Sequence, residues 1–464
     1  MSGSRIPEAE IGKTELQVPD WGRFITVRTF LRVLGLIYLI AFLSFGVQAN
    51  GLVGARGILP VRDFLTAMRE AAGGAAFREA PTILWLGASD AAIRAVWICG
   101  ALAALIAMWG RRQRTALALC LVLWISVCVA GQEFLSFQWD ILLSEAGFLA
   151  IFASDSRILV WLFRWLVFRL MFFSGVVKLL SGDPNWRNLT ALHYHYETQP
   201  LPNPVAWYMY QLPLGMQKVS TAFTFVAELL VPVLFFAPRP VRRIAAAVTV
   251  ALQLLILATG NYTFFNWLAI ALCLWLWIEP RAQWGSKVEW VLAAFIAVTS
   301  GLLFLQLFGI PMPPGGAAVM HTVDPLRIVN SYGLFAVMTT ERPEIVVEGS
   351  ADGVEWKAYE FRYKPGDLHR APPVVAPHQP RLDWQMWFAA LGNYQQNRWF
   401  VNFVIRLLQG ESTVTRLLAY NPFPNGPPKY VRARVYLYHF TTWGSRDWWS
   451  REERGMYLPA VSLK

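Results

Sequence analysis

The sequence predicts a polytopic α-helical membrane bundle of about nine spans, followed by a β-rich, sandwich-like C-terminal domain with inserted helices. Composition is the first reason: the 464 residues are 55% hydrophobic and only 15% charged, whereas soluble domains carry about 25% charged residues. Long apolar runs fill residues 29–310, and shorter alternating runs follow them. The first pattern is typical of membrane-spanning helices and the second of strands, so the lipid bilayer is the first partner that we predict.

Nine apolar segments are candidates for spans, since a helix needs roughly 20 apolar residues to cross the bilayer core. They are residues 29–47, 92–109, 115–130, 138–153, 157–181, 219–237, 244–258, 262–278 and 288–308. The fourth is the weakest of the nine because it contains Asp140 and Glu145. We therefore predict a transmembrane domain over residues 29–310, with long outer loops at 50–91 and 182–217.

The loop charges predict the orientation. If residues 1–28 form a cytoplasmic N-terminal segment, the cytoplasmic loops read GRRQR, DSR, PRPVRR and EPRAQWGSK, while the short outer loops contain no Lys or Arg. This alternation follows the positive-inside rule, and it explains the formal charge of +11 without a nucleic acid partner. An odd number of spans places the C-terminal domain, residues 317–464, outside the cytoplasm. For a bacterial protein this predicts the inner (plasma) membrane and a periplasmic C-terminal domain.

The C-terminal domain begins after a linker rich in Pro and Gly. Strands are predicted at residues 319–329, 333–340, 344–349 and 354–363, with an Asp-Gly hairpin signal at Asp352 and Gly353 between the last two. Amphipathic helices are predicted at 384–391, 398–408 and 412–419, and alternation predicts a further strand at 430–441. The four Cys all lie in apolar runs without a C-x-x-C motif, which argues against thiol-disulfide chemistry.

Charged residues inside the predicted spans are the main signal for a site, because they are costly in lipid and usually face the bundle interior. Five form the predicted buried-charge network: Asp140, Glu145, Arg164, Arg169 and Glu228. Counted along the spans at about 1.5 Å per residue, Arg164 and Glu145 share one depth, and Arg169, Asp140 and Glu228 share another. We favour ion pairs between helices, with Arg169 paired to Asp140 or Glu228; a proton or substrate path is the alternative.

Two further features have a structural and a chemical interpretation. Lys178, near the outer end of the fifth span, is either a lysine that extends to the interface or a catalytic base. His193, His195 and Glu197 form an H-x-H-x-E run, which in an extended segment would place all three on one side and suit a metal. We favour an aromatic-rich cap for that run, and we predict no metal or cofactor. Hydrolase, metalloprotease and ATPase motifs are absent from the sequence.

Several long runs resemble the lipase maturation factor family. They include PRLDWQMWFAALG at residues 380–392, QWDILLSEAGFLAIF at 138–152 and FRLMFFSGVVKLLSGDPNWRNLTALHYHYETQPLPNP at 168–204, and the resemblance covers nearly the whole chain. It implies a membrane protein that assists the folding and assembly of secreted lipases, located in the endoplasmic reticulum membrane in animals, whose outer domain engages the client. The Ala- and Arg-rich composition indicates a bacterial homologue.

The candidate client contacts are Trp384, Trp387 and Trp399. Trp384 and Trp387 share one helix face, which either packs onto the β-layer or is exposed to a client; we favour the core for Trp387. A shorter resemblance, of Gly175 to Lys178 and Trp186, is to the membrane domains of vitamin K-dependent carboxylase-like proteins, and it implies that Lys178 acts as a base. We favour a non-enzymatic folding factor over this enzyme, and both over a transporter, because no inverted repeat is evident.

Overall fold

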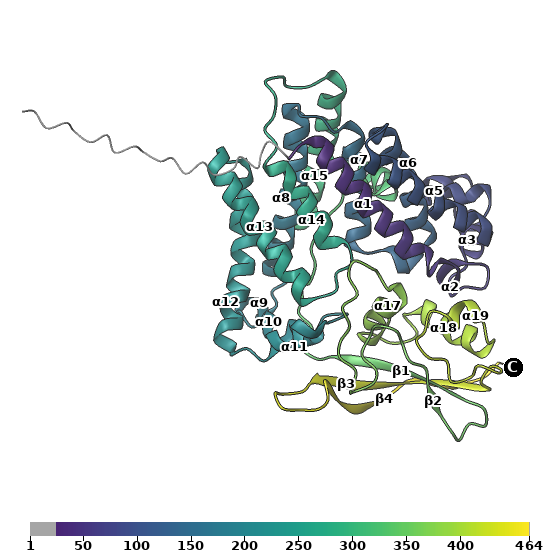
Figure 1. Ribbon diagram of the computed structural model, residues 1–464. Helices are drawn as coiled ribbons and strands as arrows, with labels where there is room; N and C mark the ends of the chain where they lie inside the picture. Colours follow the sequence, from purple (N-terminus) through teal and green to yellow (C-terminus); the bar gives the residue numbers. More distant parts are fainter. Residues whose placement is uncertain (1–24, 464) are drawn as a thin grey trace, which may run out of the picture.

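The computed structural model describes residues 25–463. A bundle of long helices makes up most of it, and a smaller domain of strands and short helices packs against one end of the bundle (Figure 1). The predicted order, a helical membrane bundle followed by a C-terminal domain that combines strands with helices, is therefore confirmed. Residues 1–24, which make up most of the predicted N-terminal segment, lie outside the described residues.

Seven helices of the described chain are long and apolar enough to cross a membrane. They are α1 (Val27–Gly46), α5 (Asp90–Trp109), α6 (Gln113–Ala130), α8 (Arg157–Leu180), α12 with its continuation η5 and η6 (Leu214–Phe236), α13 (Arg239–Thr259) and α15 (Lys287–Leu307). The other two predicted spans are shorter helices: α7 (Gln138–Phe152), and α14 (Phe265–Cys273) with η7 (Leu274–Leu276). The nine predicted spans therefore correspond to seven long helices and two short ones.

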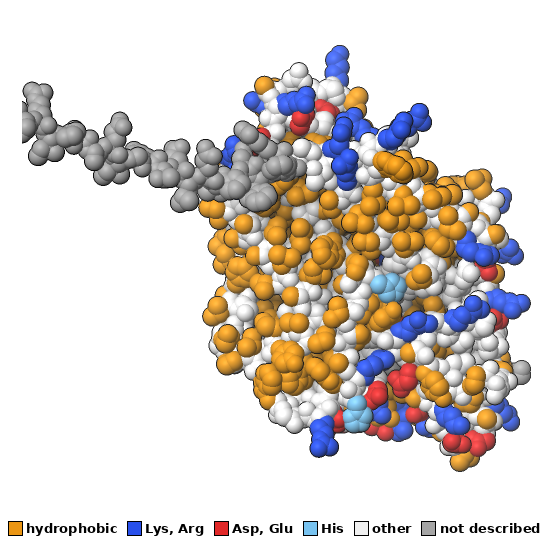
Figure 2. Space-filling model, viewed as in Figure 1, with side chains coloured by type: hydrophobic (Ala, Val, Ile, Leu, Met, Phe, Trp, Pro, Cys, Tyr) orange, Lys and Arg blue, Asp and Glu red, His pale blue; other side chains and the backbone are white. Residues whose placement is uncertain are grey.

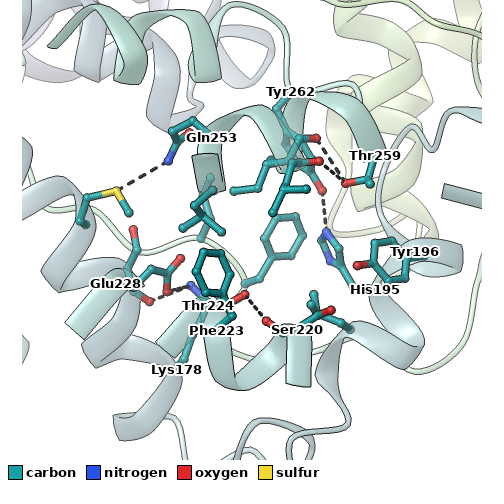
Figure 3. Close-up of a pocket in the computed structure, with 18 of the residues that line it drawn as sticks. Lys178, His195, Tyr196, Ser220, Phe223, Thr224, Glu228, Gln253, Thr259 and Tyr262 are labelled. Atoms are coloured by element: carbon teal, nitrogen blue, oxygen red, sulfur yellow. Dashed lines mark hydrogen bonds and ion pairs between the residues drawn. The ribbon is translucent and has the colours of Figure 1, made fainter. Parts of the chain in front are cut away.

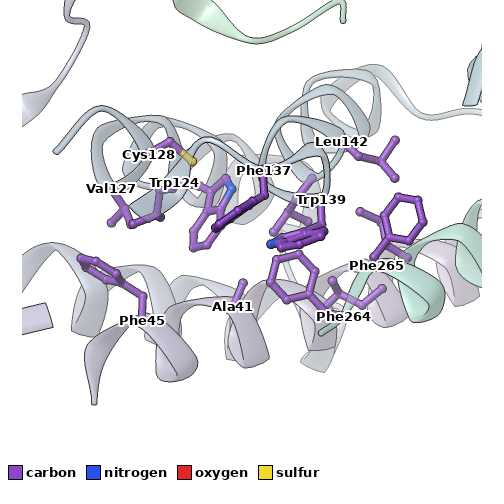
Figure 4. Packing of buried hydrophobic residues seen from close by; sticks show 14 of the residues in the cluster. Ala41, Phe45, Trp124, Val127, Cys128, Phe137, Trp139, Leu142, Phe264 and Phe265 are labelled. Carbon is purple, nitrogen blue, oxygen red and sulfur yellow. The ribbon is translucent and has the colours of Figure 1, made fainter. Parts of the chain in front are cut away.

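The short helices lie inside the bundle. Each side chain of α7 is buried or half-buried, and α14 is buried over most of its length between α13, α1 and α8. Aromatic rings fill the space around them: the Trp124 ring packs edge-on against Phe42 and against Phe264, and Phe137 stacks on Trp139 (Figure 4). A helix enclosed by other helices is not in contact with lipid along its length, so it does not need the length that a lipid-facing span needs.

The Arg- and Lys-rich loops meet at the end of the bundle where α1 begins. Arg28 of α1, Arg112 and Arg114 surround a hollow that also includes Asp155 and Arg281. At the same end Arg242 pairs with Glu279. Figure 2 shows Lys and Arg side chains at this end, and mostly hydrophobic side chains along the middle of the bundle. All four loops that the sequence assigns to one side of the membrane are therefore on one side of the structure.

The opposite end carries the two long predicted loops, and both are folded. Residues 50–91 contain α2 (Ala49–Val53), α3 (Val61–Ala72), η2 (Gly73–Ala75), α4 (Ala76–Glu79) and η3 (Ile83–Leu86). Residues 182–217 contain α9 (Pro184–Arg187), α10 (Ala191–Thr198) and α11 (Pro204–Tyr210). Asp183 caps α9 by accepting from Asn185 N at 2.9 Å, and Asn203 caps α11 by accepting from Ala206 N at 3.0 Å. Of these short helices, α2, α10 and α11 lie between the bundle and the C-terminal domain (Figure 1).

The C-terminal domain contains one antiparallel sheet, in the order β2-β1-β3-β4. Its strands are β1 (Pro343–Ser350), β2 (Lys357–Ala358), β3 (Tyr430–Phe440) and β4 (Trp449–Val461). On the bundle side it is covered by α17 (Arg381–Ala390), α18 (Arg398–Leu408) and α19 (Ser412–Thr415) (Figure 1). The predicted sandwich is wrong for the described residues, because these helices cover the face that a second sheet would cover.

Sequence patterns gave the right type for most elements of this domain but not for all. The helix at 398–408 and the strands at 344–349 and 430–441 are found almost as predicted, and Asp352 forms the expected turn by accepting from the backbone N–H of Val354 and Glu355. Residues 319–329 are wrong as a strand: they contain α16 (Gly316–Val323) and η8 (Asp324–Leu326). Residues 333–340 form no strand, and β4 was not predicted, because its charged run SREER lacks an alternating pattern.

This arrangement predicts that the start of α1 and the end of β4 lie on opposite sides of the membrane. In a bacterial host, alkaline phosphatase fused after Lys464 should be active, and a fluorescent protein fused there should be dark. The same pair of reporters inserted after Arg112 should give the reverse result, since that loop lies at the end where α1 begins. Fluorescence without phosphatase activity at Lys464 would contradict the arrangement.

Candidate functional site

The two acidic residues of α7 bind the C-terminal domain to the bundle. Asp140, which is fully buried, accepts two hydrogen bonds from Arg381 of α17, from Nη1 at 2.6 Å and from Nη2 at 2.8 Å. Arg381 is equally buried, and its Nη1 also donates to the Phe134 carbonyl at 2.9 Å. A bidentate arginine–carboxylate pair fixes distance and angle together, so this contact sets how the outer domain sits on the membrane domain.

Glu145, one turn further along α7, holds the segment that enters the C-terminal domain. Its carboxylate pairs with Arg169 of α8 and accepts from the Tyr332 hydroxyl at 2.6 Å and from Asn330 N at 2.9 Å. Arg169 in turn donates to the Asn330 carbonyl at 2.9 Å. A buried carboxylate that accepts from several donors is well compensated for its lost hydration.

The predicted pairings within the charge network are therefore wrong. Arg169 pairs with Glu145 and not with Asp140 or Glu228. Arg164 makes no pair with Glu145; it donates to the carbonyls of Trp275 at 3.2 Å and Ile278 at 2.9 Å, where η7 ends. Equal depth in separate helices does not predict an ion pair. Depth does not say which side of its helix a residue lies on, and it does not include partners from outside the bundle.

The motif that the sequence singles out around residue 380 is one of the parts of the domain that contact the bundle. Besides Arg381, Gln385 donates to the Glu133 carbonyl, and Trp387 donates to the Thr198 carbonyl at 2.8 Å. Asp383 faces the other way and accepts from the backbone N–H of Tyr363 and Lys364. Arg381, Gln385 and Trp387 of this helix thus have partners in the bundle or its short helices, and Asp383 has partners within the C-terminal domain.

The three candidate client contacts are buried. Trp384 is 3% exposed, Trp387 6% and Trp399 2%. Trp384 packs edge-on against Trp139, with 4.8 Å between ring centroids, and Trp399 packs against Phe134. Trp387 belongs to the core as expected. Its neighbours are in the outer cap, the short helices α9, α10 and α11, as well as in the β-layer. These side chains hold the two domains together and are not available to a client in this structure.

A second buried cluster joins the outer cap to the sheet. Arg342 is fully buried; it pairs with Glu344 at 2.8 Å and donates to the carbonyls of Glu197 at 2.7 Å and Pro200 at 3.0 Å. Lys364 pairs with the same Glu344 at 2.9 Å. Burial lowers the pKa of Arg342, and the Glu344 carboxylate opposes that change. None of these residues was singled out in the sequence, because they lie outside the spans, where charge is ordinary.

A cavity lies within the bundle, beside α8, α12 and α13 (Figure 3), and its volume is about 420 Å³. One wall carries Lys178 and Glu228, whose Nζ and Oε2 atoms are 2.7 Å apart. The opposite wall carries His195 and Tyr262, whose Nε2 and hydroxyl oxygen are 3.0 Å apart. The remaining lining is mostly apolar: Leu170, Met171, Leu192, Val219, Phe223, Leu252, Leu255, Ile256 and Phe265.

Local backbone features bring Lys178 to Glu228. Glu228 lies in η5 (Val226–Leu230), a π-helical turn, and such turns shift the side chains that follow them on a helix. At Gly175 the backbone of α8 is so close to η5 that an added Cβ would lie 2.7 Å from Leu229. Trp186 completes the group, with its ring centroid 5.2 Å from Lys178 Nζ. The three residues Gly175, Lys178 and Trp186 therefore lie around one ion pair at the cavity wall.

The H-x-H-x-E run does not form a metal site. It lies in the helix α10 and not in an extended segment, so His193, His195 and Glu197 point in different directions. His193 bonds to Gln217, His195 to Tyr262, and Glu197 accepts from the backbone N–H of Phe440. Within residues 25–463 no group of three or more His, Cys, Asp or Glu side chains is placed to hold a metal ion. These contacts are those of an ordered cap, which is the interpretation that we favour from the sequence.

The fold and these contacts define a class: an integral membrane protein whose C-terminal domain is attached to the helical bundle through buried ion pairs. The chain belongs to the lipase maturation factor family. It matches the lipase maturation factor transmembrane domain over residues 25–283 and the lipase maturation factor C-terminal domain over residues 328–459. The docking pairs join the two matched regions, since Asp140 and Glu145 lie in the first and Asn330, Tyr332 and Arg381 in the second.

Relatives agree with this assignment over 81–88% of their length. The chain is 36% identical to Lipase maturation factor 2 of Homo sapiens, over 100% of this chain and 84% of the relative. It is 36% identical to Lipase maturation factor 2 of Gallus gallus, over 94% of this chain and 81% of the relative. It is 32% identical to Lipase maturation factor 1 of Mus musculus, over 95% and 88%. No solved structure is significantly similar to the chain.

The Asp140–Arg381 pair predicts strong coupling between two distant substitutions. Asp140→Asn and Arg381→Gln should each lower the stability of the full chain in detergent by about 3–5 kcal/mol, because each leaves one buried charge unpaired. The double variant should lose clearly less than the sum. Arg454→Gln, at an exposed position of β4, is the control and should change the melting temperature little. Additive losses, within about 0.5 kcal/mol, would show that the pair is not coupled.

Two half-buried histidines predict loss of stability in acid. Burial and the nearby Lys178 charge lower the pKa of His195 to about 4, and burial with Arg381 and Arg362 lowers the pKa of His378 to about 4. Their ordinary pKa is 6.5, so between these values the unfolded chain binds more protons than the folded chain. The stability that they contribute is complete above pH 6.5 and falls as the pH drops toward 4.

The measurement is the melting temperature of the full chain in detergent between pH 7.5 and 4.5. His378, whose Nδ1 bonds to Ser44 Oγ at 2.9 Å, is the simpler residue to replace, because it lies at the interface between domains. His378→Gln should reduce the drop in melting temperature, and the double variant with His195→Gln should reduce it further. An equal drop in all three proteins would exclude the histidines as its cause.

Proposed function

We propose that this protein is a maturation factor for secreted lipases, which assists their folding or assembly on the extracytoplasmic side of the membrane. The observation that carries the proposal is the similarity to lipase maturation factors, which extends through both domains and includes the residues that join them. A bilayer and a lipase client are the partners that this similarity supports.

The orientation is part of the proposal. We assign residues 1–28 to the cytoplasm, 29–310 to the membrane domain and 317–464 to the extracytoplasmic domain. The clustering of the Arg-rich loops at the end opposite the C-terminal domain supports this assignment through the positive-inside rule. In a bacterium the protein would lie in the inner membrane with its C-terminal domain in the periplasm, where secreted proteins fold.

We assign client contact to the outer sheet face, defined as Trp356, Arg432, Arg434, Tyr436 and Glu453. Along β3, Val431 and Ala433 pack into the core with α18, so the alternate residues Arg432 and Arg434 point away from the bundle. Arg432 lies over the Trp356 ring at 4.0 Å and pairs with Glu348 at 2.7 Å, and Arg434 pairs with Glu453. Arginine and aromatic side chains are enriched at protein interfaces, which favours this face over the buried tryptophans.

The carboxylase-like alternative receives no support from the comparisons, which find lipase maturation factors. Lys178 forms an ion pair with Glu228, and its amine also donates to the Ser174 carbonyl at 2.9 Å. Those contacts suit a lysine that holds two helices together. This structural role accounts for Lys178 in a protein that is not an enzyme.

The proposal predicts that charge reversal on the outer sheet face lowers lipase maturation without unfolding the protein. In cells that lack their own lipase maturation factor, coexpression with the full chain should raise the amount of active secreted lipase. Arg434→Glu should reduce that gain at least fivefold, while the melting temperature of the purified variant should change by only a few degrees, because Arg434 is at the surface.

Arg454→Glu on β4 is the matched control, with the same charge change at another exposed arginine, and should support maturation normally. Truncation after Gly316 is a poor test, since it removes the partners of Asp140 and Glu145 and would destabilise the bundle. If the full chain gives no gain in active lipase, the proposed function is wrong. If Arg434→Glu supports the full gain, the client surface is elsewhere.

A further inference from the structure

We propose that the cavity beside α8, α12 and α13 binds one molecule of an uncharged single-chain lipid, whose head group carries hydroxyl and carbonyl oxygens, as in a monoacylglycerol. This inference concerns a site that the proposed function does not use, and it does not depend on that function. Three properties of the cavity carry it: its opening toward lipid, its apolar lining and the unused hydrogen-bonding capacity of its ion pair.

The cavity opens on the lipid-facing side of the bundle. Val219 of α12 and Leu255 of α13 line it and are 70% and 52% exposed on the surface. Both belong to helices that are long and apolar enough to span the membrane, and hydrophobic side chains cover this side of the bundle in Figure 2. A ligand that enters between these helices therefore comes from the bilayer and not from water.

The lining and the volume suit one hydrocarbon chain. Leu252 and Ile256 of α13 and Phe223 of α12 are among the apolar residues that line it. The volume of about 420 Å³ lies in the range of about 300–1,000 Å³ that is typical of small-molecule sites.

The ion pair at the wall supplies one donor and one acceptor. Lys178 carries three N–H groups, of which one donates to the Ser174 carbonyl and one to Glu228 Oε2. In residues 25–463 no hydrogen bond reaches the second carboxylate oxygen of Glu228, and both side chains line the cavity. The free N–H can donate to a carbonyl or ester oxygen, and the free carboxylate oxygen can accept from a hydroxyl.

The charges of the cavity favour an uncharged head group. Lys178 and Glu228 neutralise each other, and His195 on the opposite wall is uncharged at neutral pH, since its pKa is about 4. A fatty acid anion or a phosphate would bring an unpaired charge into an apolar site, which is costly. Head groups with hydroxyl and carbonyl oxygens meet the available donor and acceptor without that cost.

The test is binding of 1-monooleoylglycerol to the purified full chain in nanodiscs or mild detergent, with oleate and dioleoylphosphatidylcholine as comparison lipids. We expect about one monooleoylglycerol per chain, measured by native mass spectrometry and by a labelled lipid, and at least tenfold weaker binding of the two comparison lipids. Tighter binding of oleate or of the phospholipid would overturn the assignment of an uncharged head group.

Variants distinguish lipid binding in the cavity from lipid binding at the outer surface of the bundle. Ile256→Trp fills the space and should weaken binding at least tenfold, whereas Leu254→Trp, on the same helix and 50% exposed to lipid, should bind as the unmodified chain does. Val219→Trp, at the exposed mouth, serves if Ile256→Trp does not fold. The double variant Lys178→Met with Glu228→Gln keeps the site neutral and should lose the preference for monooleoylglycerol. Unchanged binding by both tryptophan variants at cavity positions would refute the site.

Discussion

The arrangement of this protein depends on two buried carboxylates of α7 that find their partners outside the bundle. Asp140 takes both terminal nitrogens of Arg381 from the C-terminal domain, and Glu145 takes Arg169 together with the backbone and hydroxyl donors of Asn330 and Tyr332. Buried charges without partners are too costly to persist. The membrane domain is therefore complete only when the outer domain is docked on it.

This constraint explains the form of the elements around it. The helix α7 is short and enclosed. Its first turn lies at the end of the bundle that faces the C-terminal domain, where Asp140 meets α17. Trp384 and Trp387 lie on α17 beside Arg381 and exclude water from the pair by packing on Trp139 and on the outer cap. The residues that gave the sequence its most specific family motif are thus those that join the domains, and the sheet behind them remains free for other contacts.

The cavity and the outer domain belong to different parts of the molecule but share one layer. His195 of α10 borders the cavity, and Glu197 two residues later accepts from the backbone of β3. The helix α10 therefore contacts the cavity on one side and the sheet on the other.

The sequence by itself determined the class of protein, the approximate positions of the helices, the side on which the Arg-rich loops gather and the family, because hydropathy, loop charge and long motifs are local properties of the chain. It also identified the charged residues of the spans as buried. It could not determine their partners: the depth of Arg169 matched Asp140 and Glu228, whereas the tertiary structure pairs it with Glu145, and Asp140 with an arginine 241 residues away. Spacing along the chain does not specify how helices are rotated and packed. That packing decides the pairing between distant segments, the single sheet in place of a sandwich, and the cavity at Lys178.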